Sequence, residues 1–305
     1  MNTAAAKGDK KLPVPEALVV AGHGLEGDAH AGGERQVSLL AQESVDRAAA
    51  AGMELKPGDF GENLTVQGLD LCAMGVGQRL LAGGEAILQV SGIGKICEKP
   101  CSIGQRLGKC VMPSEGVFAK AVKGGRVRPG DAVEPTTVKA GAALTSSDRC
   151  ARGEREDESG RLLVELLREL GIAVADYSVL PDDEALLSEK LKFLADRCGV
   201  DLVLTTGGTG LAPRDRMPEA TLAVLDSPAP GISEALREEG MRHTPFACLS
   251  RGVSGLRGRT LIINLPGSSS AITESAELLR AILPHALEII RAEAGDCGAG
   301  RQPHH

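Results

Sequence analysis

The chain has 305 residues, of which 42% are hydrophobic and 25% charged, so it is long enough for two domains with separate cores. It contains no Trp, one Tyr and four Phe, which argues against a single-strand nucleic-acid binder of the base-stacking type. The net charge of −7 offers no overall attraction to nucleic acid or acidic membranes, and no apolar run approaches the roughly 20 residues that span a bilayer. The first residues lack the apolar core of a secretory signal, and we expect a cytoplasmic protein with neither nucleic-acid nor membrane partners.

The N-terminal half, from about Leu12 to Pro135, consists of short apolar runs that glycines interrupt every few residues. Frequent turns between short strands predict a mainly β domain, barrel-like or sandwich-like. One helix is expected from Leu39 to Ala51, a stretch rich in helix formers that Gly52 follows as a C-cap.

The pattern changes after Glu134 to Ala142, EPTTVKAGA, where strands begin to alternate with helices. This alternation predicts a mostly parallel sheet with helices on both faces, a three-layer α/β/α domain. We therefore expect domains at residues 1–137 and 138–296 and a flexible tail at 297–305. The predicted helices and strands are SGRLLVELLREL, IAVADYSVL, PDDEALLSEKLKFLADRCG, DLVLTT, PEATLAVLD, RTLIINLPG and SAITESAELLRAILPHALEIIRAEA.

Four loops of the second half follow predicted strands: TSSDRCARGE, LPDDE, TTGGTGLAPRD and NLPGSSSA. Ligands of open α/β sheets bind at the carboxyl ends of the strands. Glycines let backbone N–H groups approach an anion, and the serines before the last helix lie where a helix N-terminus favours phosphate. GGTG matches neither a P-loop nor G-x-G-x-x-G, so a plain strand-to-helix turn is the alternative.

Acidic residues lie at the same predicted edge of the sheet, at Asp182, Asp183 and Asp215. Carboxylates beside a phosphate site repel the ligand unless a cation lies between them, and Mg²⁺ is the usual one. Such a site suits phosphoryl or nucleotidyl transfer, which needs positioning and charge neutralisation. The alternative for Asp182 and Asp183 is helix capping. Arg214, Arg251 and Arg257 either offset ligand phosphates or are simply solvated.

Three segments, LTSSDRCARGEREDESG, LTTGGTGLAPRDRMPEAT and TPFACLSRGVSGLRGRTLIINLPGSSSA, closely resemble the molybdopterin adenylyltransferase domain, also found in gephyrin. The resemblance covers about Val138 to Ala294. It implies a homotrimeric α/β/α enzyme that joins ATP to molybdopterin with Mg²⁺ near Asp182 and Asp215, giving adenylylated molybdopterin and pyrophosphate alongside other molybdenum-cofactor biosynthesis proteins. Residue by residue, it implies catalytic carboxylates at Asp182 and Asp215, a pterin-site serine at Ser250, and ligand-binding positions at Asp148, Gly207, Gly208, Thr209, Gly210, Asn264, Pro266, Gly267 and Ser268.

The first half, with GDFGEN, LQVSGIGKIC and GGRVRPGD, resembles the MOSC domain of molybdenum-cofactor sulfurases over about Leu12 to Glu134. The resemblance implies a barrel-like β fold that binds molybdenum cofactor or carries sulfur, with its cysteine at Cys97. Cys101 can resolve a persulfide on Cys97 by forming a disulfide with Cys97. The alternatives are inert buried thiols, or a zinc site built from Cys97, Cys101, Cys110 and His30. The opening MNTAAAKGDKK lacks the apolar first strand usual in that family.

Together, the two halves predict a fusion that serves molybdenum-cofactor biosynthesis. Two other classes of function stay open. The chain can instead hold finished cofactor or molybdopterin as a carrier or sensor without catalysis, or act as a scaffold, which nothing in the sequence supports. Turnover of molybdopterin, ATP and Mg²⁺ separates the three.

Overall fold

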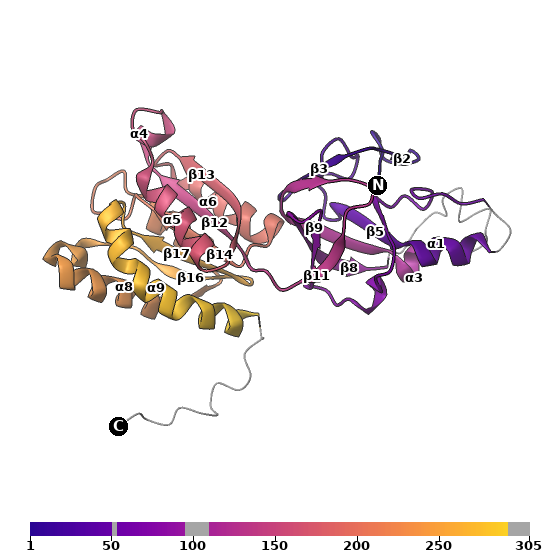
Figure 1. Ribbon diagram of the computed structural model, residues 1–305. Coiled ribbons are helices and arrows are strands. Elements are labelled where there is room, and N and C mark those ends of the chain that lie inside the picture. The colour runs from indigo at the N-terminus through magenta and orange to yellow at the C-terminus, as the bar shows by residue number, and fades with distance from the viewer. Residues whose placement is uncertain (51–53, 95–109, 292–305) are drawn as a thin grey trace, which may run out of the picture. The chain divides into compact units, whose positions relative to one another are not determined.

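The computed structural model describes residues 1–50, 54–94 and 110–291, and the chain separates into two compact units (Figure 1). One unit holds Met1–Val138 with Arg197–Gly199, and the other holds Lys139–Asp196 and the chain from Val200 onward. Each unit has a hydrophobic core of its own. Within the described ranges, no helix combines the length and apolar character needed to cross a membrane.

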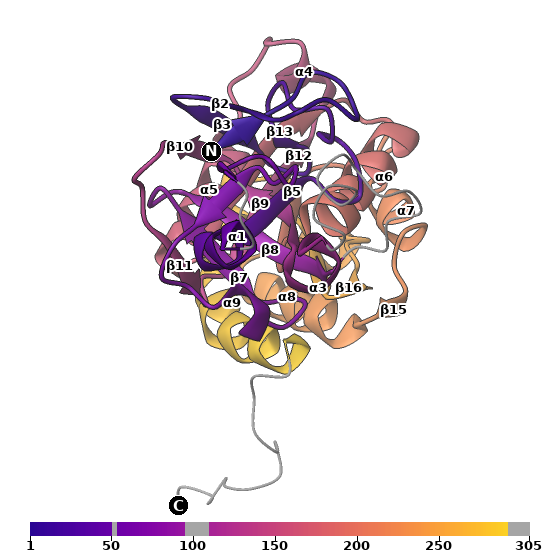
Figure 2. The same cartoon turned by 90° about the vertical axis from the view of Figure 1, so that its right-hand side faces the viewer.

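The first unit is mainly β, as predicted. Its strands form a sheet in the order β11-β7-β8-β9-β5-β6, a sheet in the order β10-β3-β4 and the short pair β1-β2 (Figure 2). β5 and β6 run parallel, and the other neighbours are antiparallel. The elements are β1 (Asn2–Thr3), β2 (Leu12–Pro13), β3 (Ala17–Val20), β4 (Gly24–Leu25), β5 (Val37–Ala41), α1 (Gln42–Ala49), β6 (Leu64–Val66), η1 (Leu71–Ala73), β7 (Arg79–Ala82), β8 (Ala86–Ile93), α3 (Met112–Glu115), β9 (Val117–Lys123), β10 (Gly125–Val127) and β11 (Val133–Thr136).

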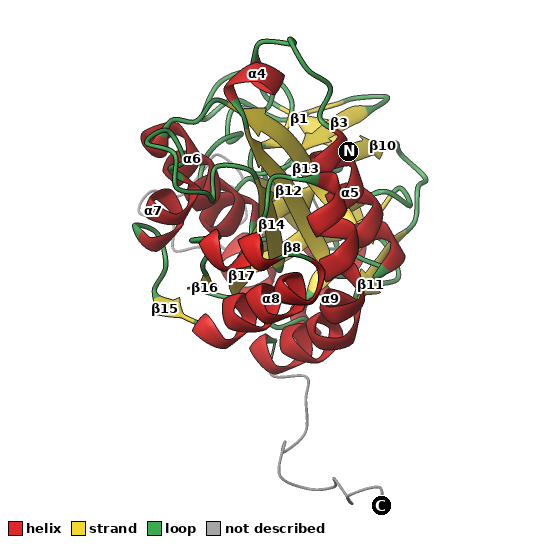
Figure 3. Ribbon diagram, turned by 90° about the vertical axis from the view of Figure 1, so that its left-hand side faces the viewer, coloured by secondary structure: helices red, strands yellow, loops and turns green. Residues whose placement is uncertain are grey.

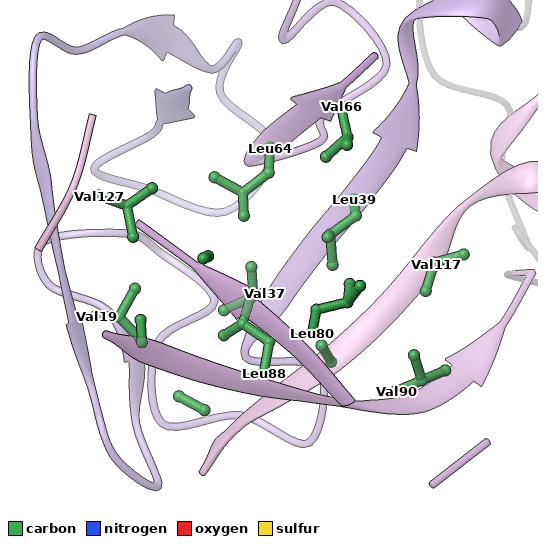
Figure 4. Packing of buried hydrophobic residues seen from close by; sticks show 14 of the residues in the cluster. Val19, Val37, Leu39, Leu64, Val66, Leu80, Leu88, Val90, Val117 and Val127 are labelled. Atoms are coloured by element: carbon green, nitrogen blue, oxygen red, sulfur yellow. The ribbon is translucent and has the colours of Figure 1, made fainter. Parts of the chain in front are cut away.

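The core of this unit is aliphatic, as the scarcity of aromatic residues requires. Leu39, Leu64, Leu80, Leu88 and Val117 come from five different strands and point into one shared interior (Figure 4). All five are almost fully excluded from solvent. Burying each such side chain contributes about 1.5–3 kcal/mol, so β-branched and leucine side chains suffice to hold the sheets together.

The helix predicted from Leu39 to Ala51 is wrong at its start. Leu39 to Ala41 complete strand β5, which pairs with β6 and β9, and α1 begins only at Gln42. The local sequence favours a helix, but Val37, Leu39 and Leu40 are buried in the sheet, and this packing outweighs intrinsic propensity. The expected cap at Gly52 lies outside the described residues.

A buried ion pair links the N-terminal segment of the first unit to the loop after β4. Lys11 Nζ lies 2.7 Å from Asp28 Oδ2, and both side chains are almost completely excluded from solvent. The same carboxylate accepts hydrogen bonds from the Asn63 side chain and from the backbone of Ala4 and His30. Burial raises the pKa of Asp28, but the hydrogen bond and charge of Lys11, together with the backbone hydrogen bonds from His30 and Ala4, outweigh it and hold the pKa below its ordinary value.

We expect Lys11→Met to destabilise the first unit by about 3–5 kcal/mol, because it leaves the Asp28 charge buried without its partner. Thermal unfolding followed by calorimetry measures this. Lys10→Met is the matched control: Lys10 is exposed and pairs with Asp59, and its loss should cost at most about 1 kcal/mol. Equal effects of the two substitutions would contradict the prediction.

The same pair predicts a pH dependence. The pKa of Asp28 is lower in the folded protein, so its contribution to stability is present above about pH 4 and is lost as the pH falls below that value. Lys11→Met should reduce this acid sensitivity, which unfolding curves between about pH 2 and pH 6 measure.

The second unit contains a six-stranded sheet in the order β13-β12-β14-β17-β16-β15. β13, β12, β14 and β17 run parallel to one another. β16 runs antiparallel to both of its neighbours, β17 and β15, which makes the sheet mixed with a parallel majority. The elements are β12 (Ala140–Ser146), α4 (Asp148–Ala151), α5 (Glu158–Glu169), β13 (Ala173–Leu180), α6 (Glu184–Lys192), the π-helical η2 (Phe193–Cys198), β14 (Leu202–Thr206), α7 (Met217–Leu222), β15 (Ser227–Pro228), α8 (Pro230–His243), η3 (Pro245–Leu249), β16 (Ser254–Arg257), β17 (Thr260–Leu265) and α9 (Ser269–Ile290).

Helices lie on both faces of this sheet, so the three-layer prediction is confirmed. α5, α8 and α9 cover one face, and α6 and α7 lie on the other (Figure 3). The apolar face of α5 supplies Leu163, Leu166 and Leu167 to the core. All of the predicted helices and strands of this half are present, whereas α8 was not predicted; its turn-rich start, beginning at Pro230, gives a weak local helix signal.

Candidate active site

The parallel strands bring their carboxyl ends to one edge of the sheet. Ser146 of β12 is paired with Leu180 of β13, and Thr206 of β14 is paired with Leu265 of β17, so all four strands end side by side. The four loops that follow these strands start at this edge and carry all of the predicted site residues of this unit except Ser250 and the β17 residue Asn264. This arrangement is the one in which open α/β sheets bind ligands.

The loop after β14 depends on glycine at two positions. Gly207 and Gly208 have φ values of +83° and +62°, in the region that other residues rarely adopt. A Cβ at Gly207 would lie only 2.2 Å from the carbonyl oxygen of Ser146. A Cβ at Gly267, from the last loop, would lie 3.2 Å from the Cα of Gly207. The glycines therefore let three loops pack backbone against backbone at this edge.

Asp182 is fixed by its neighbours in an orientation toward the site. Ser146 Oγ donates a 2.5 Å hydrogen bond to its Oδ1, and the N–H of Asp148 donates to its Oδ2 at 3.2 Å. The helix-capping role belongs to Asp183, which accepts from the N–H of Leu186 at the start of α6. The capping alternative at the start of α6 therefore holds for Asp183.

Asp215 closes a tight turn in the glycine-rich loop. Its Oδ2 accepts from the N–H of Ala212 at 2.9 Å, and a Cβ on Gly210 would lie 2.8 Å from the same oxygen. Among the described residues, its Oδ1 has no hydrogen-bond partner, so one carboxylate oxygen remains available to a ligand. A side chain at position 210 would therefore push this carboxylate oxygen aside.

Two cavities, of about 410 and 230 Å³, meet at Gly208, Asp215 and Gly267. Asp182 and Asp215 both line the smaller cavity, and Asp215 also faces the larger one. The predicted site residues that line the larger cavity are Gly208, Thr209, Gly210, Asp215, Ser250, Asn264, Pro266, Gly267 and Ser268; those that line the smaller one are Asp182, Gly207, Gly208, Asp215 and Gly267.

Asp148 is the one predicted site residue of this unit that lines neither cavity. Its Oδ1 accepts from the N–H of Asp182, and its Oδ2 forms an ion pair with Arg214 Nη2 at 2.6 Å. These contacts place Asp148 behind Asp182, where it orients that residue's backbone.

Asn264 faces the larger cavity, yet its side chain is already hydrogen-bonded within the protein. It donates to the hydroxyls of Thr205 and Thr221, both at 2.9 Å, and accepts from the N–H of Val253. Its amide therefore ties β14, α7 and the start of β16 together. Ser268 caps α9 by accepting from the N–H of Ala271, and both residues line the larger cavity, so the N-terminus of this helix faces that cavity.

Several residues of the site were not singled out from the sequence. Thr145 is buried, its Oγ1 has no hydrogen-bond partner among the described residues, and it lines the smaller cavity with Ser146 and Asp157. Arg237 lines the larger cavity and donates to the carbonyl of Gly252 at 2.9 Å. The position of Thr145 and Ser146 at the end of a predicted strand was a usable signal; for Arg237 on an unpredicted helix there was none.

The carboxylates fit a magnesium ion only if a ligand completes its coordination. In the described parts of the chain, no three His, Cys, Asp or Glu side chains come together as a metal site. Mg²⁺ is commonly held by one or two carboxylates together with substrate phosphates and water. Asp182 and Asp215 on one cavity match that donor set, and such an ion would supply charge neutralisation to bound phosphates.

The predicted cysteine site of the first unit, Cys97 and Cys101, lies outside the described residues. Cys110, the third cysteine of the zinc alternative, is half-buried and packs against the cluster around Leu40 and Val45. His30 donates its backbone N–H to Asp28.

Comparison with known proteins assigns both halves of the chain. Residues 142–285 match the family described as "Probable molybdopterin binding domain", and residues 26–134 match the MOSC domain. A molybdopterin adenylyltransferase of Helicobacter pylori is 39% identical over 149 residues, which is 48% of this chain and 85% of that protein. The chain belongs to the molybdopterin adenylyltransferase family. Within that family, it carries an additional N-terminal MOSC domain.

Other relatives differ in how much of their length is matched. The "Molybdenum cofactor synthesis protein cinnamon" of Drosophila melanogaster is 40% identical over 148 residues, and the chain spans a quarter of its length. A "Molybdenum cofactor biosynthesis bifunctional protein" of Synechococcus elongatus is 39% identical over 162 residues, half of its length. The solved structure of the molybdopterin biosynthesis enzyme MoaB from Thermus thermophilus is 48% identical with a TM-score of 0.49, covering 51% of this chain and 98% of that one.

Proposed function

We propose that the chain catalyses Mg²⁺-dependent adenylylation of molybdopterin by ATP in molybdenum-cofactor biosynthesis, with release of pyrophosphate. The observation that carries the proposal is that Asp182 and Asp215 line one cavity beside a glycine-rich loop and a helix N-terminus. Family membership of the C-terminal half supports it independently.

In this reaction a phosphate oxygen of the pterin substrate bonds to the α-phosphorus of ATP, and the bond to the departing pyrophosphate breaks. The chain needs no covalent intermediate for such a transfer, only groups that align two anions and offset their charge. The backbone at Gly207 and Gly208 suits phosphate binding because glycine has no side chain to keep an anion away, and the N-terminus of α9 suits it through the helix dipole. Ser250 lines the larger cavity, on the side where the pterin is proposed to bind.

The experiment that tests this function is incubation of the full chain with molybdopterin, ATP and MgCl₂, followed by mass detection of adenylylated molybdopterin and pyrophosphate. We expect product with Mg²⁺, loss of product with EDTA, and recovery when Mg²⁺ is added back. Tight binding of molybdopterin without product would instead favour a carrier or sensor.

The remaining assignments rest on the family resemblance. We propose that the MOSC half, residues 1–137, closes as a barrel-like domain and binds molybdenum cofactor or carries sulfur at Cys97 with Cys101. The adenylyltransferase half, residues 138–296, is proposed to form a homotrimer in the cytoplasm and to pass its product to other cofactor-biosynthesis proteins. Exposed apolar side chains at Met241, Phe246 and Leu249 are compatible with subunit contacts. Light scattering of the purified chain measures the subunit number.

A further inference from the structure

Arg251, next to Ser250, directs its side chain into the protein. Its Nε donates to the carbonyl of Gly210 at 2.7 Å, and its Nη2 donates to the carbonyl of Asp215 at 2.7 Å. Its Nη1 forms an ion pair with Glu219 at the start of α7. A single planar guanidinium thus holds both ends of the segment 210–215 and the helix that follows.

The charge of Arg251 is balanced within the protein. Burial raises the pKa of Glu219, but the hydrogen bond and charge of Arg251 outweigh it, so the carboxylate has a lowered pKa and is ionised at neutral pH. Arg251 also lines neither of the two cavities formed by the described residues. Both observations argue against its use as a direct phosphate ligand.

The backbone of Arg251 adds a further link. Its N–H donates to the carbonyl of Thr209 at 2.8 Å, while its neighbours Ser250 and Gly252 line the larger cavity. The wall that carries Ser250 is thereby fixed to the loop that carries Asp215. Arg is suited to this task because its rigid fork of donors fixes several acceptors relative to one another, whereas the Lys ammonium is a single point on a flexible chain.

We propose that Arg251 is a positioning residue for adenylylation: its guanidinium fixes Asp215 against the cavities through the carbonyls of Gly210 and Asp215. This inference rests on the proposed function for its kinetic readout. Glu219 has the supporting role of holding the guanidinium in place through its ion pair.

The test compares Arg251→Gln, Arg251→Lys and Glu219→Gln with Arg280→Gln, which removes an exposed ion pair between α9 and Glu169 at the end of α5 and serves as control. We expect Arg251→Gln to lower kcat about 100-fold with the KM for ATP changed less than about threefold, since a displacement of about 1 Å at a reacting group has an effect of that size. Arg251→Lys should keep little more activity than Arg251→Gln. Glu219→Gln should lower kcat by a smaller factor, and Arg280→Gln should leave kcat unchanged.

Two results would overturn the inference. The first is recovery of kcat by Arg251→Lys; the second is a KM for ATP raised at least about tenfold at unchanged kcat, as expected for a phosphate ligand. Hydrogen exchange of residues 209–217 without substrate gives a readout independent of turnover: Arg251→Gln should accelerate exchange there, and unchanged exchange contradicts the proposal. If the wild-type chain forms no product, the proposed function fails, while the exchange result still decides the role of Arg251.

Discussion

Asp215→Asn should lower adenylylation by about 10³-fold or more while leaving the fold intact. Asn keeps an oxygen that accepts from the N–H of Ala212, so the turn is preserved, but the charge that faces both cavities is lost. Removing one preorganised electrostatic group from an active site commonly costs 10²- to 10³-fold, and loss of a magnesium-binding carboxylate adds to that. Product formation at saturating ATP and Mg²⁺ measures the effect, with circular dichroism as the check on folding.

The matched control is Asp183→Asn, the same chemical change in a neighbouring acid. Asp183 caps α6 and lines neither cavity, and Asn is an equally good N-cap, so activity and stability should stay close to wild type. Near-normal turnover of Asp215→Asn would remove Asp215 from the mechanism. Equal losses in both variants would mean that the local acidic charge, and not the position of Asp215, matters.

Gly207→Ala should damage both stability and activity. Alanine at φ +83° is strained by about 1–2 kcal/mol, and its Cβ would lie 2.2 Å from the Ser146 carbonyl, which belongs to the backbone and cannot rotate away. We expect the free energy of unfolding of the second unit to fall by about 2–4 kcal/mol. We also expect at least about 100-fold lower turnover, because the collision displaces the glycine-rich loop that lines the smaller cavity.

Gly258→Ala separates strain from collision. Gly258 also has a positive φ, of +55°, but a Cβ there meets nothing within 4 Å, and Gly258 lies in the turn between β16 and β17, at the opposite end of β17 from the loop that carries Gly267. It should lose only about 1–2 kcal/mol and keep full activity. Urea unfolding and turnover of the two variants measure the difference; if Gly207→Ala behaved like Gly258→Ala, close packing of the loops would not matter for function.

Local pattern was sufficient for much of the second unit. The strand over Leu202–Thr206 follows from five consecutive apolar or β-branched residues, and α5 follows from its apolar spacing. Each of these two signals comes from residues that are only a few positions apart along the chain. The position of Asp182 and Asp215 at strand ends followed in the same way, because the carboxyl ends of parallel strands meet at one edge.

Local pattern failed where distant segments compete for the same residues. Leu39 and Leu40 favour a helix by composition but are buried in a strand, because β6 and β9 pair with them on either side. Nor does spacing along the chain show that Arg251 turns inward to Gly210 and Asp215, about 40 residues away. Such partners depend on how the whole sheet brings its loops together.

The sequence by itself determined the two-part organisation, the family resemblance of each half and the acids and glycines on which the site is built. The tertiary structure alone decided which acid faces the cavity and which caps a helix, that the Asn264 amide bonds to protein groups, and that two cavities share Asp215. The physical reason is the distance along the chain over which each kind of interaction acts. Hydrophobic periodicity and turn chemistry act between near neighbours, whereas hydrogen-bond partners and cavity walls arise from residues that only long-range packing brings together.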